Sequence, residues 1–243
     1  MKPDESIALV TGANKGIGKE IARQLAGKGV IVLLGARDPT RGKQAVADLR
    51  SKALPVQFLP LDVTDQQSVD QAVSDIESQY GRLDILVNNA GIAVDWGPPS
   101  EAEIDAVRST YETNVFGVFR VTKAMLPLLR KSKAARIVNV SSALGSVTLT
   151  ADPNGPFRGR SMLMAYCSSK SALNMLTLQF AGELASSGIK VNAVTPGYVA
   201  TDMNQHQGTR TVEQGAATPV RLALLPDDGP TGGFFSDEGV VPW

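Results

Sequence analysis

Short apolar runs alternate with longer segments of mixed polarity along the whole chain. The runs are rich in β-branched residues and have few polar interruptions. Such a pattern predicts buried strands of a parallel sheet, because helices cover both faces of that kind of sheet and leave no polar side. The six expected strands are residues 7–10, 30–34, 56–59, 85–87, 137–140 and 191–194.

Amphipathic segments fill the gaps between these strands. The expected helices are residues 17–28, 39–51, 65–80, 101–130 and 163–186. The strict alternation predicts right-handed crossovers and an α/β fold, a doubly wound parallel sheet with helices on both faces. We expect a single domain over residues 1–243, since α/β chains of this length commonly stay undivided. Residues 148–160 and 197–218, which are rich in turn-forming residues, are read as loops.

Charge and cysteine content narrow the function classes. The 24 basic and 24 acidic side chains cancel, which gives no general electrostatic reason to bind nucleic acid or an anionic membrane. Cys167 is the single cysteine, so an intramolecular disulfide and a cysteine zinc cluster are excluded. Residues 1–6 are charged and precede too short an apolar run for a signal peptide. The longest run, 30–34, is far below the roughly 18 residues of a spanning helix. These features predict a soluble cytoplasmic protein.

A glycine-rich turn at residues 11–18 follows the first strand and opens the first helix. In this context glycines let backbone amides and the helix N-terminus approach a pyrophosphate. The alternative is a tight turn without a ligand. The spacing is G-x-x-x-G-x-G, which differs from the common G-x-G-x-x-G. The residues expected to contact a dinucleotide here are Gly12, Asn14, Lys15, Gly16, Ile17 and Gly18.

Tyr166 and Lys170 are four positions apart in a predicted helix and therefore share one face. An ammonium beside a phenol favours the ionised phenol. We expect the pKa of Tyr166 to lie below its usual value of about 10, which would allow proton exchange near neutrality. Such a proton donor suits hydride transfer at a carbonyl. The competing interpretation is a core tyrosine beside a solvated lysine.

The chain resembles the short-chain dehydrogenase/reductase family along nearly its whole length. Seven motifs carry the resemblance in order: Thr11-Gly12-x-x-x-Gly16-Ile17-Gly18, Asp62-Val63, Asn88-Asn89-Ala90-Gly91, Asn114, Ser142-Ala143-Leu144-Gly145, Tyr166-x-x-x-Lys170 and Pro196-Gly197. Residues 14–18, 35–38 and 40–42 look like the NADPH-dependent carbonyl reductase branch. The resemblance implies a Rossmann-type fold and hydride transfer between a nicotinamide and a carbonyl or alcohol.

The resemblance also assigns roles to individual residues. Tyr166 would donate the proton, and Lys170 would stabilise the tyrosinate and reach the ribose hydroxyls. Ser142 would hold the carbonyl oxygen, and Asn114 would organise a water that links Lys170 to solvent. Ser141 competes for the serine role, but the family pattern puts the serine three residues before a glycine. Further cofactor contacts are expected at Asp62, Val63, Asn88, Ala90, Gly91, Pro196, Gly197, Val199 and Thr201.

Charge favours NADP as the cofactor. An acidic residue closing the second strand would bind the ribose hydroxyls of NAD, but Ala36 occupies that position and Arg37 follows. Lys15 can approach the same 2′-phosphate. The alternative is that Arg37 pairs with Asp38 or solvates the surface.

The predicted function is NADPH-dependent reduction of a small-molecule ketone or aldehyde. Two alternatives stay open, a 3-oxoacyl thioester reductase and a non-catalytic dinucleotide-binding sensor. No metal site is expected, since His206 is the sole histidine and lies in a polar loop. We expect residues 197–218 to form a substrate lid and residues 148–160 a loop insertion. In carbonyl reductases a longer insertion obstructs a helix interface, so monomer and homo-oligomer both stay open.

Overall fold

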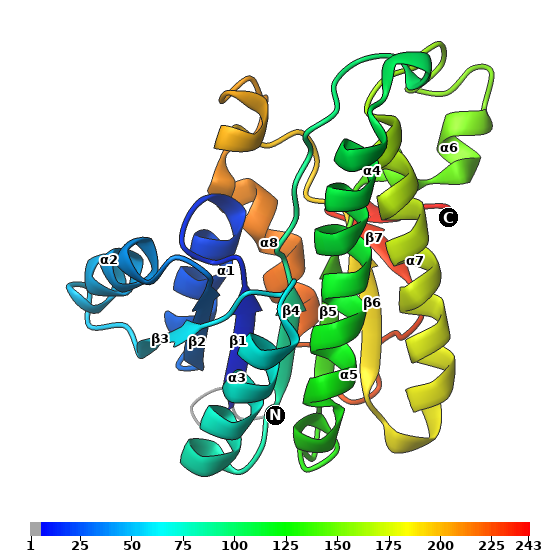
Figure 1. Cartoon of the computed structure of the whole chain (residues 1–243). Helices are drawn as coiled ribbons and strands as arrows, with labels where there is room; N and C mark the ends of the chain where they lie inside the picture. Colours follow the sequence, from blue (N-terminus) through cyan, green and yellow to red (C-terminus); the bar gives the residue numbers. More distant parts are fainter. Residues whose placement is uncertain (1–5) are drawn as a thin grey trace.

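The computed structural model describes residues 6–243, so the expectation about the charged residues 1–5 lies outside the described part. These residues form an eight-stranded sheet of order β3-β2-β1-β4-β5-β6-β7-β8 (Figure 1). Strands β1 to β7 pair in parallel, and β8 pairs antiparallel with β7. The strands are β1 (Ile7–Thr11), β2 (Ile31–Ala36), β3 (Val56–Pro60), β4 (Ile85–Asn88), β5 (Arg136–Val140), β6 (Lys190–Val194), β7 (Phe234–Ser236) and β8 (Gly239–Val240).

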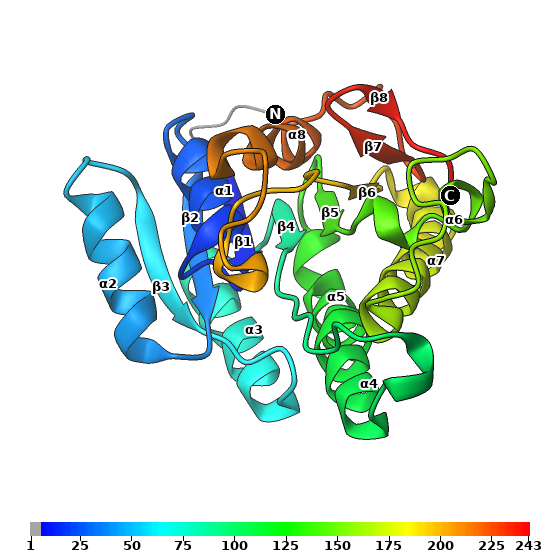
Figure 2. The same ribbon diagram turned by 90° about the horizontal axis from the view of Figure 1, so that it is seen from above.

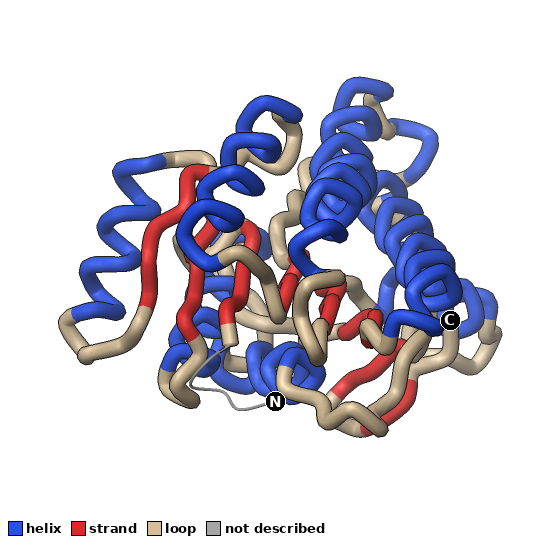
Figure 3. Tube along the Cα trace, turned by 90° about the horizontal axis from the view of Figure 1, so that it is seen from below, coloured by secondary structure: helices blue, strands red, loops and turns tan. Residues whose placement is uncertain are grey.

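Helices cover both faces of the sheet, as the views along the strands show (Figures 2 and 3). Consecutive side chains of β1 face opposite cores: Val10 packs toward α1, α2 and α8, and Leu9 toward α3, α5 and α7. The helices are α1 (Gly16–Ala26), α2 (Pro39–Arg50), α3 (Gln66–Tyr80), α4 (Ile104–Tyr111), α5 (Val118–Leu129), α6 (Val147–Ala151), α7 (Met164–Leu184) and α8 (Val212–Ala223). Short 3₁₀ turns are η2 (Pro99–Glu101), η4 (Ala143–Gly145), η5 (Ala185–Ser187) and η6 (Asp202–Asn204).

The predicted doubly wound parallel sheet is confirmed, and all six expected strands are present. Three local expectations need correction. Residues 197–218, read as a loop, include the start of α8, whose capping box joins Thr211 to Gln214. Residues 148–160 include most of α6. The single helix expected over 101–130 is α4, a π-helical segment η3 (Glu112–Gly117) and α5.

No helix within residues 6–243 is both long and apolar enough to cross a membrane.

Alanine substitution at two helical glycines should have opposite effects. A Cβ at Gly42, in the first turns of α2, would overlap the ring of Phe58 on β3, whereas a Cβ at Gly182 in α7 would meet nothing within 4 Å. We expect Gly182→Ala to raise the free energy of unfolding by up to about 1 kcal/mol through helix propensity. Gly42→Ala should lower it by about 1–3 kcal/mol through overpacking. Urea denaturation measures both, and equal stabilisation would contradict the packing of α2 on β3.

Candidate active site

The turn after β1 and the turn after β4 are joined by hydrogen bonds. Thr11 Oγ1 accepts from the backbone N–H groups of Asn89 and Ala90, both at 3.0 Å, and donates to Val87 O at 3.5 Å. The side-chain amide of Asn89 donates back to Thr11 O at 2.9 Å and Gly12 O at 3.2 Å. The two turns therefore form one rigid floor at the carboxyl edge of the sheet.

Two glycines of the first turn have no room for a side chain. A Cβ at Gly12, which has φ of +63°, would lie 2.8 Å from Ala90 Cα. A Cβ at Gly18 would overlap the Asn89 amide. Gly16, with φ of +56°, opens α1. The first amides of α1 are thus exposed toward the carboxyl edge, which suits an anionic group such as a pyrophosphate.

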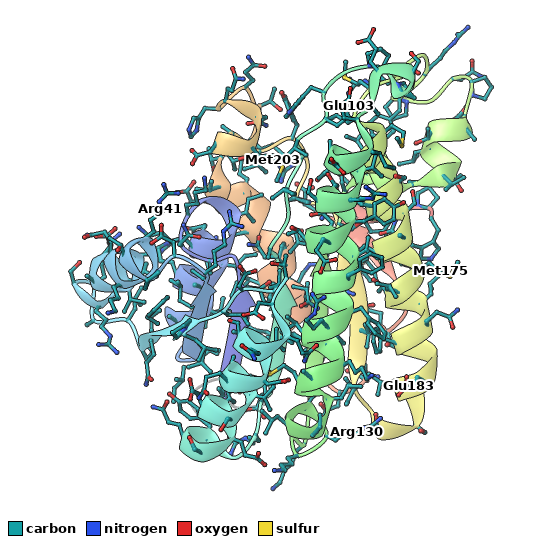
Figure 4. All side chains as sticks on the ribbon, viewed as in Figure 1. Arg41, Glu103, Arg130, Met175, Glu183 and Met203 are labelled. Atoms are coloured by element: carbon teal, nitrogen blue, oxygen red, sulfur yellow. The ribbon has the colours of Figure 1, made fainter. Side chains whose placement is uncertain are left out.

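A cleft of about 1490 Å³ runs along this edge. Most of the predicted site residues line it: Gly12, Asn14, Lys15, Gly16, Ile17, Gly18, Arg37, Asp62, Val63, Ala90, Gly91, Tyr166, Lys170, Pro196 and Thr201. Segments from the start, middle and end of the chain therefore meet at one site. Figure 4 shows Arg41 and Met203, two further lining residues, at this end of the molecule.

Five predicted residues are not among those that line the cleft: Asn88, Asn114, Ser142, Gly197 and Val199. The Asn88 amide donates to Thr122 and Asn139 inside the protein, and it is the neighbouring Asn89 that lines the cleft. Val199 is buried and forms a β-bridge with Arg210. Asn88, Asn114 and Val199 are buried, whereas Ser142 is half-buried and Gly197 is exposed.

Tyr166, half-buried, and Lys170, buried, lie next to each other at one end of the cleft. Lys170 Nζ lies 5.5 Å from the centre of the Tyr166 ring and donates to Val140 O at 2.8 Å. Burial raises the pKa of Tyr166 to about 12, while a hydrogen bond with Ser142 acts in the opposite direction. Burial also lowers the pKa of Lys170 to about 8. The expected lowering of the phenol pKa is therefore wrong: desolvation dominates.

The structure separates the two candidate serines. Ser141 contributes to the cleft wall, but its hydroxyl is buried and donates to Asn174 Oδ1 at 2.6 Å. Ser142 is not among the residues that line the cleft, yet its hydroxyl forms a hydrogen bond with the Tyr166 side chain. Polarising a carbonyl needs a hydroxyl next to the proton donor, and the Ser142 hydroxyl has that position. This favours Ser142.

Asn114 lies in the π-helical segment η3 and is completely buried. Its amide accepts from Ile92 N and donates to Ile92 O, both at 2.9 Å, and donates to Ser169 at 3.0 Å. It therefore fixes the loop after β4. A Cβ at Gly91 would lie 3.3 Å from Asn114 Oδ1 and 3.6 Å from Lys170 Nζ, so all three meet at one point. The Oδ1 atom can accept one more hydrogen bond there.

The other end of the cleft carries cations. Arg37 is exposed and has no ion-pair partner among residues 6–243, because Asp38 instead caps α2 and pairs with Arg41 at 3.3 Å. Lys15 pairs with Asp202 at 2.7 Å. Arg41 and Asn89 are among the lining residues that sequence reasoning missed. Arg41 carried a signal, since residues 40–42 resemble carbonyl reductases, whereas Asn89 carried none beyond its motif.

Metal chemistry has no support at this site, since no group of three or more His, Cys, Asp or Glu side chains within residues 6–243 could hold an ion.

Comparison with known proteins agrees with this arrangement. The profile of the short chain dehydrogenase family matches residues 6–211. The chain is 39% identical to short-chain dehydrogenase/reductase 1 of Saponaria officinalis, covering 97% of this chain and 95% of that protein. It is 38% identical to carbonyl reductase (NADPH) 3 of Mus musculus, covering 98% of each.

Solved structures show the same fold. Salutaridine reductase from Papaver somniferum superposes with a TM-score of 0.84 at 33% identity, covering 96% of this chain and 99% of that chain. A short chain dehydrogenase from Shigella flexneri, solved in complex with NADP, superposes with a TM-score of 0.85 at 28% identity, covering 96% and 97%.

The buried Lys170 predicts a pH dependence of stability. Between its pKa of about 8 in the folded protein and the ordinary 10.5, the unfolded chain binds a proton that the folded protein lacks. Stability should therefore rise with pH across this window, by up to about 1.4 kcal/mol per pH unit. Lys170→Met should remove that rise in stability between pH 8 and 10. Tyr166, whose pKa is raised from 10 to about 12, lowers stability with rising pH only above this range.

Urea unfolding at several pH values measures this slope. Lys131→Met, which removes a surface ammonium paired with Glu77, is the matched control and should keep the wild-type slope. A Lys170→Met slope equal to that of wild type would show that Lys170 does not carry the effect.

Proposed function

The chain belongs to the short-chain dehydrogenase family, and on this basis we propose that it is an NADPH-dependent reductase of ketone or aldehyde carbonyls. The observation that carries the proposal is that Tyr166, hydrogen-bonded to Ser142 and next to the buried Lys170, lies at the end of a cleft that begins at the glycine turn. Members of this family are oxidoreductases that bind a nicotinamide dinucleotide.

The chain's own residues fit a dinucleotide. Side chains are excluded at Gly12 and Gly18, where a Cβ would collide with Ala90 and Asn89, and this keeps the backbone of the turn open to a ligand. The turn would hold the pyrophosphate, and Asp62 and Val63 lie where the cleft passes the end of β3. When bound, the reduced nicotinamide supplies a hydride to the carbonyl carbon.

Tyr166 acts as the proton donor in this proposal. With its pKa raised to about 12, the phenol is protonated at neutral pH, which is the form that reduction requires. An alkoxide is more basic than a phenolate, so the proton passes from Tyr166 Oη to the substrate oxygen as negative charge develops there. The hydroxyl of Ser142 donates a hydrogen bond to the same oxygen and stabilises that charge.

Lys170 returns the proton in this proposal. Its pKa of about 8 lies close to neutrality, so its ammonium can give up a proton to the tyrosinate and regain one. Asn114 fixes the backbone beside Lys170 Nζ and would hold the water through which that proton comes from solvent.

NADP is the proposed form of the cofactor. Ala36 stands at the end of β2 in place of an acid, and Arg37 and Arg41 line the cleft there. Two relatives support this choice by their names, carbonyl reductase (NADPH) 3 and the dehydrogenase in complex with NADP. Guanidinium groups at this position would bind the 2′-phosphate.

The two alternatives are less well supported. A dinucleotide sensor has no need of a serine and a lysine placed on either side of a tyrosine, yet Ser142 and Lys170 both lie next to Tyr166. An acyl-carrier thioester reductase would carry a basic docking surface. The curated relatives include (+)-neomenthol dehydrogenase of Arabidopsis thaliana and salutaridine reductase of Papaver bracteatum, whose names favour small-molecule substrates.

Replacing Tyr166 by phenylalanine should abolish reduction without unfolding the protein. The variant keeps the ring and removes the proton, so we expect kcat to fall by about 10²–10⁴-fold. The measurement is NADPH oxidation with a panel of aromatic ketones, quinones, aliphatic aldehydes and oxoacyl thioesters. NADPH binding, followed by nicotinamide fluorescence, should change little, and turnover near the wild-type rate would refute the role of Tyr166.

Cofactor preference should depend on Arg37. We expect the wild-type protein to favour NADPH over NADH in kcat/KM, and Arg37→Ser to lower the NADPH value by about 10–100-fold with little effect on NADH, because a charged hydrogen bond contributes about 1.5–3 kcal/mol. Arg130→Ser is the control, since Arg130 lies at the opposite end of the molecule in a surface pair with Glu183 (Figure 4). A wild-type preference for NADH would overturn the assignment.

A further inference from the structure

The segment after β6 forms a loop with a closed neck. Val199 and Arg210 form a β-bridge, with hydrogen bonds from Ala200 N to Arg210 O at 2.9 Å and from Arg210 N to Tyr198 O at 3.0 Å. The Arg210 guanidinium pairs with Asp237 at 2.7 Å. The neck is thus anchored to the turn between β7 and β8. We call residues 200–209, which lie beyond the neck, the lid tip; it is the gold segment above α1 in Figure 1.

The lid tip is a unit held by its own hydrogen bonds. Thr201 and Asn204 form a capping box around η6, and His206 N donates to Thr201 O at 2.9 Å. The Asn204 amide donates to Val199 O at 2.9 Å, which joins the tip to its neck. These hydrogen bonds join the tip to its neck but not to the glycine turn.

One ion pair connects this unit to the glycine turn. Lys15 Nζ donates to Asp202 Oδ2 at 2.7 Å, across 187 positions of sequence. Hydrogen bonding to Lys15, ahead of the contribution of His206, lowers the pKa of Asp202, so the carboxylate is ionised at neutral pH. The Thr201 methyl also lies 3.6 Å from the position of a Cβ on Gly16. The tip therefore covers the turn proposed to hold the pyrophosphate.

The pair is suited to a reversible closure rather than to stability of the fold. The two side chains are 56% and 54% exposed, and exposed ion pairs contribute little to the free energy of folding. Breaking this pair leaves the neck and the capping box intact. A lysine ammonium has three donors, so Lys15 can bind Asp202 and still offer hydrogen bonds to a phosphate.

We propose that Asp202 is a positioning residue that fastens the lid tip over the glycine turn through Lys15 and so slows release of the bound dinucleotide. This inference rests on the proposed dinucleotide-binding function. The opposite hypothesis is that the Asp202 carboxylate competes with the cofactor phosphate for Lys15. The two hypotheses predict opposite results when the Asp202 charge is removed. If Asp202 fastens the lid tip, the dinucleotide leaves faster, and if Asp202 competes with the phosphate, the dinucleotide binds more tightly.

The ion pair can be tested first in the protein without dinucleotide. We expect amide hydrogen exchange in residues 201–206 to become several-fold faster in Asp202→Asn and in Lys15→Met. The double variant should exchange no faster than either single variant. Glu77→Gln is the matched control, because it breaks the similarly exposed 2.9 Å pair with Lys131, and neither residue lines the cleft or touches the lid tip. Exchange in Asp202→Asn equal to that of wild type would overturn the fastening.

Cofactor release is the second measurement, made by stopped-flow nicotinamide fluorescence with NADPH and with NADH. We expect Asp202→Asn to release both about three- to ten-fold faster, by similar factors, and Glu77→Gln to release both at the wild-type rate. Slower NADPH release in Asp202→Asn with unchanged NADH release would identify Asp202 as a competitor and overturn the proposal. A wild-type protein that binds neither dinucleotide would refute the proposed function itself, whereas binding with unchanged release refutes only the role of Asp202.

Discussion

The cleft depends on the close approach of two backbone turns that belong to opposite halves of the sheet. Strand order reverses between β1 and β4, and this is where open parallel sheets bind their ligands. Thr11 holds the β4 turn by two hydrogen bonds, and Gly12 has no side chain because Ala90 occupies the space. The glycine turn is therefore held against the β4 turn by the protein's own contacts, and it lines the same cleft as Tyr166. A side chain at position 12 would push the β1 turn away from the β4 turn and widen the cleft between them.

Burial, more than charge, sets the chemistry at the other end of the cleft. Taking a phenol and an ammonium out of water favours the neutral form of each, which moves the two pKa values in opposite directions, to about 12 for Tyr166 and about 8 for Lys170. A protonated phenol can give up its proton only to a strong base, and the oxygen of a carbonyl that is accepting hydride becomes one. The same environment makes the hydrogen bond from Ser142 stronger than it would be in water.

Most of the sheet could be predicted because each central strand is a continuous apolar run between turn residues. Strands β7 and β8 were missed since Phe234–Ser236 and Gly239–Val240 are too short for a periodic signal. Helix α8 was read as loop because its Gly215 and Pro219 are breakers on average, yet Gly215 is needed where a Cβ would collide with Val199. The residues proposed for the site followed from motifs, but their contacts did not: the pairing of Lys15 with Asp202 and the sign of the Tyr166 pKa shift arise only from folding.

Local charge balance explains how one end of the cleft can gather cations in a protein of zero formal net charge. Lys15, Lys19 and Arg41, at the starts of α1 and α2, each pair with a carboxylate, respectively Asp202, Asp48 and Asp38. These pairs relieve the repulsion that clustered cations would otherwise feel, and they are exposed enough to rearrange at little cost. Arg37 stands among them with no such partner within residues 6–243. In the proposed function, a phosphate dianion would meet this uncompensated guanidinium first, and Lys15 would offer it the donors that Asp202 leaves free. The same ammonium would then bind the anion and the lid tip together.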